Sequence, residues 1–170
     1  MIDRDRRPVR VEPGPGQESV WDYPRPPAVV PSARRVRVEH AGVEVADSTR
    51  AIRILETAGA PVWYLPRDDV RMDLLRRSEG RGTWCEWKGS ASYFDLVAGD
   101  VTSRRAAWTY ERPSPGYEAI AGHVAFYASR VDRATVDGEE ARPQPGGFYG
   151  GWVTDEIVGP IKGEPGSDGW

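Results

Sequence analysis

The chain has 170 residues and a formal net charge of −3, with 39% hydrophobic and 29% charged residues. This length allows one domain with a sizeable core, and the composition excludes a disordered chain. No apolar run approaches the roughly 18 residues that a membrane helix needs, and the acidic balance argues against a protein built mainly to bind nucleic acid.

The N-terminal sequence MIDRDRRPVR is charged and contains no apolar stretch typical of a secretory signal. The single cysteine, Cys85, cannot form an internal disulfide, which fits a reducing compartment. We therefore expect a soluble cytoplasmic protein. Nineteen glycines and fifteen prolines make up about a fifth of the chain, a density that excludes long helices and favours short strands joined by turns.

Residues 1–31 form the first segment in chain order. EPGPGQES, at 12–19, is typical of a flexible lead. The prolines of VWDYPRPPAVVP, at 20–31, favour extended backbone, and this stretch carries Trp21 and Tyr23. We expect an arm that lies on the domain with its aromatic side chains inward; a free linker is the alternative.

The next residues carry strand patterns. Valines alternate with charged residues across RRVRVEHAGVEVADS, 34–48, which predicts a β-hairpin turning at Ala41-Gly42. TRAIRILET, 49–57, favours a strand, although a short helix also fits. APVWYLPRDDV, 60–70, is a β-prone run between two prolines.

Further strands are expected beyond residue 70. The pattern predicts a strand at 72–78, a loop at 79–82, a strand at 90–99 ending at Gly99-Asp100, and a strand at 104–113 with Ala106, Trp108 and Tyr110 on one face. SPGYEAIAG, 114–122, predicts a short helix capped by Ser114. Residues 123–138 are expected to form strand, turn and strand.

The last segment is dense in glycine and proline but still aromatic, and we expect it to wrap around the domain. Together these elements predict a mainly β fold: a single domain of coiled antiparallel sheets with one short helix. We place an N-terminal arm at 1–31, the core domain at 32–140 and a C-terminal arm at 141–170.

Six segments in this order resemble a known bacterial family, the domain-of-unknown-function 427 family, which is also labelled as a nucleotidyltransferase domain. They are VWDYPRPP, RILET, PVWYLPRDDVRMDLL, CEWKGSASYFDL, AAWTYERPSPGYEAIAGHVAFY and GGFYGGWVTDEIVGP. The resemblance is centred on residues 34–137, and the arms resemble a longer form of the family. It implies a small, mostly β fold similar to the β-tent or Mss4-like folds, and no established activity.

The label itself implies chemistry that the residues do not support. Nucleotidyl transfer needs paired carboxylates for Mg²⁺ and a glycine-rich phosphate loop. Asp68-Asp69 lies in a turn pattern, and no phosphate loop of the usual spacing is present. Some relatives of β-tent folds carry zinc, but one cysteine with His40 and His123 cannot easily complete a zinc site. We predict no metal and no cofactor.

Cys85 has two readings. A nucleophilic cysteine needs a base, and His123 is the only plausible one; the alternative, which we favour, is packing at the head of a strand.

Lys88 follows Trp84 and Trp87 and precedes a glycine, and KG recurs in the family motif. A cation beside tryptophan faces can hold an anionic or planar ligand, or Lys88 can simply lie over Trp87 at the surface. Both readings stay open.

Other candidates surround these residues in the predicted sheet. Tyr64, Tyr93, Trp108 and Tyr110 either pack in the core or line a pocket. Glu56, next to an apolar strand, needs a partner such as Arg53 or Arg71, becomes an acid–base candidate if it lies near Lys88, and is otherwise a surface charge.

We therefore predict a small-molecule pocket. The expected site residues are Lys88 and Glu56 as the ionisable, possible catalytic pair, with Arg53, Tyr64, Trp87, Tyr93, Trp108, Tyr110 and His123 as ligand contacts. A small polar or anionic metabolite is the expected partner, and the protein is expected to be a monomer or homodimer. The alternative is an adaptor that uses its aromatic arms. Binding of nucleotides or single-stranded nucleic acid is the weakest hypothesis.

Overall fold

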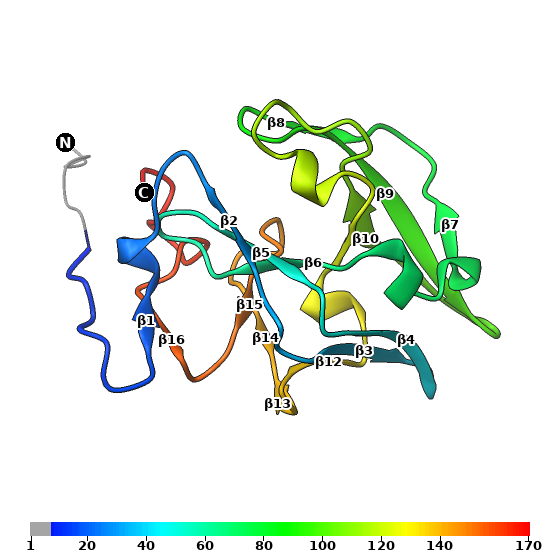
Figure 1. Cartoon of the computed structure of the whole chain (residues 1–170), viewed down its shortest axis with the longest axis horizontal. Coiled ribbons are helices and arrows are strands. Elements are labelled where there is room, and N and C mark those ends of the chain that lie inside the picture. The colour runs from blue at the N-terminus through cyan, green and yellow to red at the C-terminus, as the bar shows by residue number, and fades with distance from the viewer. Residues whose placement is uncertain (1–7) are drawn as a thin grey trace.

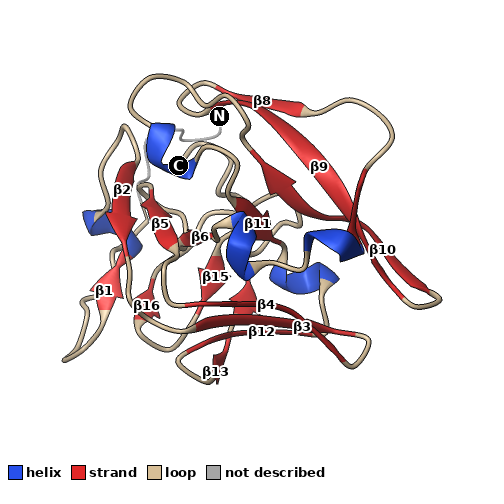
Figure 2. Ribbon diagram, turned by 45° about the vertical axis from the view of Figure 1, so that its right-hand side comes forward, coloured by secondary structure: helices blue, strands red, loops and turns tan. Residues whose placement is uncertain are grey.

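The computed structural model describes residues 8–170 and is mainly β, as the sequence predicts (Figures 1 and 2). Its helical parts are single 3-10 turns, and within the described residues none is long and apolar enough to cross a membrane. The strands form five antiparallel or parallel groups, and the three larger sheets enclose the core.

The largest sheet is built on the long hairpin of β9 and β10. Its strands are β7 (Leu75–Arg77), β8 (Thr83–Cys85), β9 (Gly89–Ala98), β10 (Val101–Thr109) and β11 (Val124–Phe126). The spatial order is β11-β10-β9-β7, with β8 pairing the other end of β9, and every pairing is antiparallel.

The second sheet contains the predicted hairpin. Its order is β13-β12-β3-β4, from strands β3 (Val36–His40), β4 (Val43–Ser48), β12 (Arg133–Val136) and β13 (Glu139–Glu140). Val36 and Val38 are fully buried while Arg37 between them is not, so the alternation predicted from sequence sets the inner face. Ala41 and Gly42 both have positive φ, which matches the two-residue turn that such hairpins prefer.

The third sheet joins the N-terminal segment to the domain. Its order is β2-β5-β6, from β2 (Ala28–Pro31), β5 (Ile52–Leu55) and β6 (Val62–Tyr64). Residues 52–55 are thus a strand, as favoured from the sequence. An isolated bridge between Leu65 and Val124 connects the end of β6 to β11, so the third sheet adjoins the largest one.

The two terminal segments are tied to each other and to the core. Short strands β1 (Glu18–Ser19) and β16 (Ile157–Val158) pair in parallel, at the end of the molecule opposite β7 (Figure 1). The Trp21 indole N–H donates to the Pro160 carbonyl at 2.8 Å, and Tyr23 is buried. Strands β14 (Arg142–Pro143) and β15 (Trp152–Val153) form the last pair.

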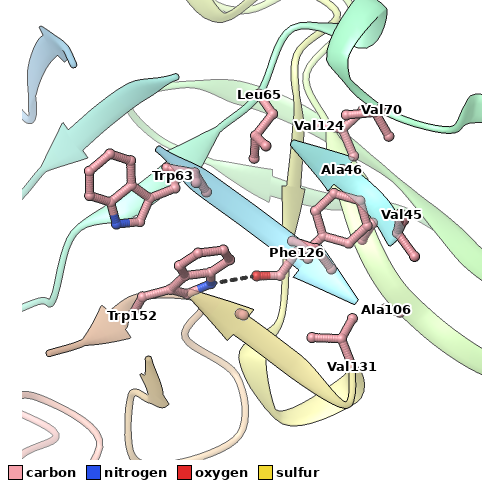
Figure 3. Close-up of a cluster of buried hydrophobic side chains, with 14 of the residues drawn as sticks. Val45, Ala46, Trp63, Leu65, Val70, Ala106, Val124, Phe126, Val131 and Trp152 are labelled. Atoms are coloured by element: carbon pink, nitrogen blue, oxygen red, sulfur yellow. Dashed lines mark hydrogen bonds between the residues drawn. The ribbon is translucent and has the colours of Figure 1, made fainter. Parts of the chain in front are cut away.

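The main core lies where the three sheets meet, and the C-terminal segment contributes to it. Trp152 is 1% exposed and packs near Trp63, and its indole N–H donates to the Phe126 carbonyl at 2.9 Å (Figure 3). The core therefore draws on residues beyond position 140.

The short helix expected at 114–122 is present only as a single 3-10 turn, at Glu118–Ile120. Gly116 has φ of +98°, which a right-handed helix does not allow, and the Ser114 N–H donates to the Lys88 carbonyl instead of starting a helix. The strand expected at 72–78 is shorter than predicted, because Met72–Leu74 forms a 3-10 turn before β7.

Candidate functional site

A cavity of about 300 Å³ lies beside a cluster of buried aromatic side chains. We call it the aromatic cavity. It is bounded by β5 and β6, by the β8–β9 hairpin, by β10, and by the C-terminal segment. Its wall consists of Ile54, Glu56, Gly59, Ala60, Val62, Tyr64, Thr83, Trp84, Cys85, Glu86, Trp87, Lys88, Tyr93, Trp108, Tyr110, Tyr127, Gln144, Phe148, Tyr149, Gly150, Gly151 and Lys162.

The β8–β9 turn places Lys88 and Trp87 on this wall. Gly89 has φ of +100°, a conformation that glycine adopts readily, and it lets the chain turn back into β9. The Lys88 carbonyl then accepts the Ser114 N–H at 2.8 Å, which ties the turn to the loop after β10. The Lys88 Nζ lies 5.8 Å from the centre of the Tyr110 ring, within the range of a cation–π contact.

Buried aromatic rings make up the side of the cavity formed by β6 and β10. The Trp108 indole N–H donates to the Tyr64 hydroxyl at 3.2 Å, and the two rings meet edge to face. Trp108 also packs against Tyr127, with ring centres 4.6 Å apart. Burial raises the pKa of Tyr64 and of Tyr110 well above the usual value of a phenol, so both hydroxyls stay protonated at neutral pH.

The C-terminal segment closes the remaining side. Gln144 is buried; its side-chain oxygen accepts the Ala60 N–H at 3.1 Å and its amide donates to the Lys162 carbonyl at 2.9 Å. The Lys162 Nζ lies 5.6 Å from the Tyr149 ring centre and donates to the Trp170 carbonyl oxygen. Sequence reasoning did not single out these residues. The glycine pairs in GGFYGGW, which permit close backbone contact, are the available signal.

Seven of the nine residues singled out from the sequence line the cavity: Glu56, Tyr64, Trp87, Lys88, Tyr93, Trp108 and Tyr110. The other two lie outside its wall. Along β5, Ile54 faces the cavity, whereas Arg53 forms an ion pair with Glu18 and lies over the Trp63 ring. His123 Nδ1 lies 3.3 Å from the Ala121 carbonyl oxygen.

Glu56 has no ion-pair partner among residues 8–170. Arg53 is paired with Glu18, and Arg71 with Asp73, so neither suggested partner is available to it. Within this part of the chain, Glu56 and Lys88 also do not form a direct ion pair, although both line the same cavity.

Cys85 lines the cavity too, and no histidine is among its wall residues. The base that thiol chemistry would require is therefore not beside it, and Cys85 packs on the aromatic cluster. Asp69 belongs to a 3-10 turn, where it accepts hydrogen bonds from Ser48 and Arg50. The described residues contain no group of three or more potential metal ligands.

The chain matches a protein-family model described as a domain of unknown function (DUF427). The match covers residues 28–137, which is more than half of the chain and includes most of the cavity wall. The comparison with curated proteins found no match.

Proposed function

The chain belongs to the DUF427 family, and we propose that it binds a small polar or anionic metabolite in the aromatic cavity. The observation that carries this proposal is the convergence of Lys88 with buried aromatic residues from β6, β9 and β10 around one hollow. Ligand sites are concave, mainly apolar and equipped with a few polar groups that orient the ligand.

The size and the wall of the cavity support binding of a small molecule. About 300 Å³ is at the lower end of the range for ligand pockets. Segments that are distant in sequence form the wall, and the Gln144 hydrogen bonds hold two of them together. A preformed wall reduces the entropy that binding would cost.

The proposal concerns binding because the nucleophilic reading of Cys85 lacks a neighbouring base. Within residues 8–170 Glu56 and Lys88 form no direct ion pair, so a catalytic role for the two would need a ligand that contacts both. A ligand must therefore be identified first.

The aromatic arms offer less to a partner protein than the sequence suggests. Tyr23 is buried and donates its hydroxyl to Glu18, and Trp21 packs edge to face on Trp170 with ring centres 5.6 Å apart. These side chains are used within the molecule, which weighs against the adaptor hypothesis.

The test is a thermal-shift screen of the wild-type protein against a broad metabolite panel that includes nucleotides. A ligand at 100 times its Kd adds about 2.7 kcal/mol to the free energy of unfolding, which raises Tm by several degrees. Lys88→Ala should lose most of that shift. Arg76→Ala removes one positive charge from an exposed strand position outside the cavity and should keep it. If no metabolite raises the wild-type Tm, or if both variants respond alike, the proposal fails.

A further inference from the structure

The buried hydroxyl of Tyr64 has a proton that the protein leaves unused. The Trp108 indole N–H, which can only donate, occupies the Tyr64 oxygen as acceptor. The hydroxyl proton cannot be donated to Trp108, and no other residue among 8–170 accepts it. Tyr64 is 1% exposed and lines the aromatic cavity, so an acceptor for this proton would have to lie in the cavity.

The hydroxyls of three other buried tyrosines in the same cluster each form a hydrogen bond within the protein. The Tyr127 hydroxyl donates to the Phe148 carbonyl at 3.1 Å, and the Tyr117 hydroxyl donates to the Pro27 carbonyl at 2.9 Å. The Tyr93 hydroxyl pairs with the Thr83 hydroxyl at 2.8 Å. Within the described residues, Tyr110 shares with Tyr64 the lack of an acceptor, and it also lines the cavity.

Two neutral hydroxyl donors thus border the cavity without an acceptor among residues 8–170. Their rings lie 6.3 Å apart, and burial raises the pKa of both, which keeps the protons in place. A ligand that carries an accepting oxygen can use both donors, whereas a ligand that presents a further donor cannot, so the site favours the former.

Lys88 adds a positive charge to the cavity wall beside Tyr110. Its Nζ is 5.8 Å from the Tyr110 ring centre, and it has no ion-pair partner among residues 8–170. Glu56 and Glu86 also line the cavity, so the attraction for an anion is local to Lys88 and the two phenols. An oxygen acceptor that also carries negative charge uses both features.

We propose that the ligand is a small planar carboxylate, whose carboxylate accepts hydrogen bonds from the Tyr64 and Tyr110 hydroxyls beside Lys88. The aromatic side chains of the cavity wall suit a conjugated or aromatic body attached to that group. This inference rests on the proposed function and adds the chemical class of the ligand and the point at which it is recognised.

The experiment uses three matched probes with the full-length protein: 2-naphthoate, 2-naphthamide and 2-naphthylmethylamine. Binding is followed by NMR of the indole N–H groups, with the Trp108 signal assigned from Trp108→Phe. We expect 2-naphthoate to bind most tightly and the amine most weakly. Because Trp108 donates to Tyr64, a carboxylate that accepts from Tyr64 should also move the Trp108 N–H signal.

The variants separate recognition from structure. Tyr64→Phe should weaken 2-naphthoate binding by about tenfold or more, as expected for a hydrogen bond to a charged group, and Tyr110→Phe should act in the same direction. Tyr117→Phe is the matched control, because it makes the same change in the same cluster at a hydroxyl that already donates to Pro27 and lies outside the cavity wall. It should leave the affinity unchanged.

The outcomes distinguish the two proposals. Suppose that a metabolite from the panel binds. The carboxylate inference is then overturned, while the cavity remains a binding site, by any of three results: the amine binds as tightly as the carboxylate, no naphthyl probe binds, or Tyr64→Phe weakens 2-naphthoate binding no more than Tyr117→Phe. If neither panel nor probes bind the wild type, the proposed function is overturned and this inference with it.

Discussion

Gly150 lies directly against the indole ring of Trp108. A methyl group built on the Gly150 Cα would overlap the six-membered ring, so only glycine allows the backbone this approach. Gly150 belongs to the C-terminal segment and Trp108 to β10, and both line the aromatic cavity. The contact therefore joins the terminal segment to the ring that holds the Tyr64 hydroxyl.

Gly150→Ala should destabilise the fold and disturb the cavity. Forcing extra volume into a packed contact costs about 1–3 kcal/mol, and each kcal/mol lowers Tm by roughly 2–4 °C in a domain of this size. Gly169→Ala is the control, because its added methyl group would meet nothing within 4 Å and its φ is not positive. Equal Tm values for the two variants, measured by calorimetry, would contradict the close packing.

Asp95 holds the irregular part of β10. The strand register shifts between Ser103 and Ala107, and Arg105 within that shift has a φ of +49°. The Asp95 carboxylate accepts the Arg105 N–H at 2.9 Å and the Ser78 hydroxyl at 2.6 Å. The guanidinium carbon of Arg105 lies 3.9 Å from the centre of the Tyr93 ring. This irregular part of β10 therefore adjoins the cavity wall.

Those two hydrogen bonds lower the pKa of Asp95, and the bond from Ser78 contributes more than the bond from Arg105. The carboxylate therefore stabilises the fold above its ordinary pKa of about 3.9, and this contribution is lost as pH falls through the lower folded-state value. Asp95→Ala should reduce the free energy of unfolding at pH 7 by about 1–3 kcal/mol. The difference in free energy of unfolding between Asp95→Ala and the wild type, measured by urea titration, should become smaller in acid.

Asp100→Ala, at the exposed turn of the same hairpin, is the control for this measurement and should stay close to wild type at every pH. A deficit of Asp95→Ala that is constant from pH 7 to pH 3 would show that the carboxylate charge does not support the bulge.

Much of the sheet structure could be predicted because strand periodicity is a local signal. The valines of 36–45 alternate, and Trp108 and Tyr110 share a face because they are two residues apart. The same rule brings Trp108 and Tyr110 to the cavity together, whereas Glu56, Trp87 and Lys88 lie outside the strands and reach it through tertiary contacts. It also shows how Arg53 could have been excluded, since Arg53 and the cavity-lining Ile54 are adjacent in a strand and point to opposite faces.

Long-range packing could not be predicted in this way. The cap and turn residues of 114–122 suggested a helix, but hydrogen bonds to Lys88 and Tyr110 decide the path of that segment. Likewise, Gln144, Gly150 and Lys162 reach the cavity by tertiary contacts, and the glycine-rich sequence around them has no period that places them there.

Trp152 should be essential to folding although it lies in the C-terminal segment. It is 1% exposed, packs in the main core and donates to the Phe126 carbonyl. Trp152→Ala should lower the free energy of unfolding by about 3–5 kcal/mol or prevent folding. Trp84→Ala removes the same side chain from a position that is 72% exposed and should change it by no more than about 0.5 kcal/mol. Similar urea midpoints for both variants would refute this role.

Cys85 offers a chemical test of the cavity itself. It is the only cysteine in the chain and lines the cavity wall, so N-ethylmaleimide that reacts with its thiol leaves an adduct inside the hollow. The modified protein should lose the Tm increase given by a ligand from the metabolite panel, because the adduct occupies the ligand's space. Cys85→Ala should keep that increase, since the cysteine packs there and does not carry the binding.

The reagent-treated Cys85→Ala protein is the control, because it has no thiol to modify, and mass spectrometry shows which samples carry the adduct. Full ligand stabilisation of the modified wild type would place the ligand elsewhere on the molecule. Loss of stabilisation in untreated Cys85→Ala would instead make the thiol part of the binding site, against the packing role that the structure supports.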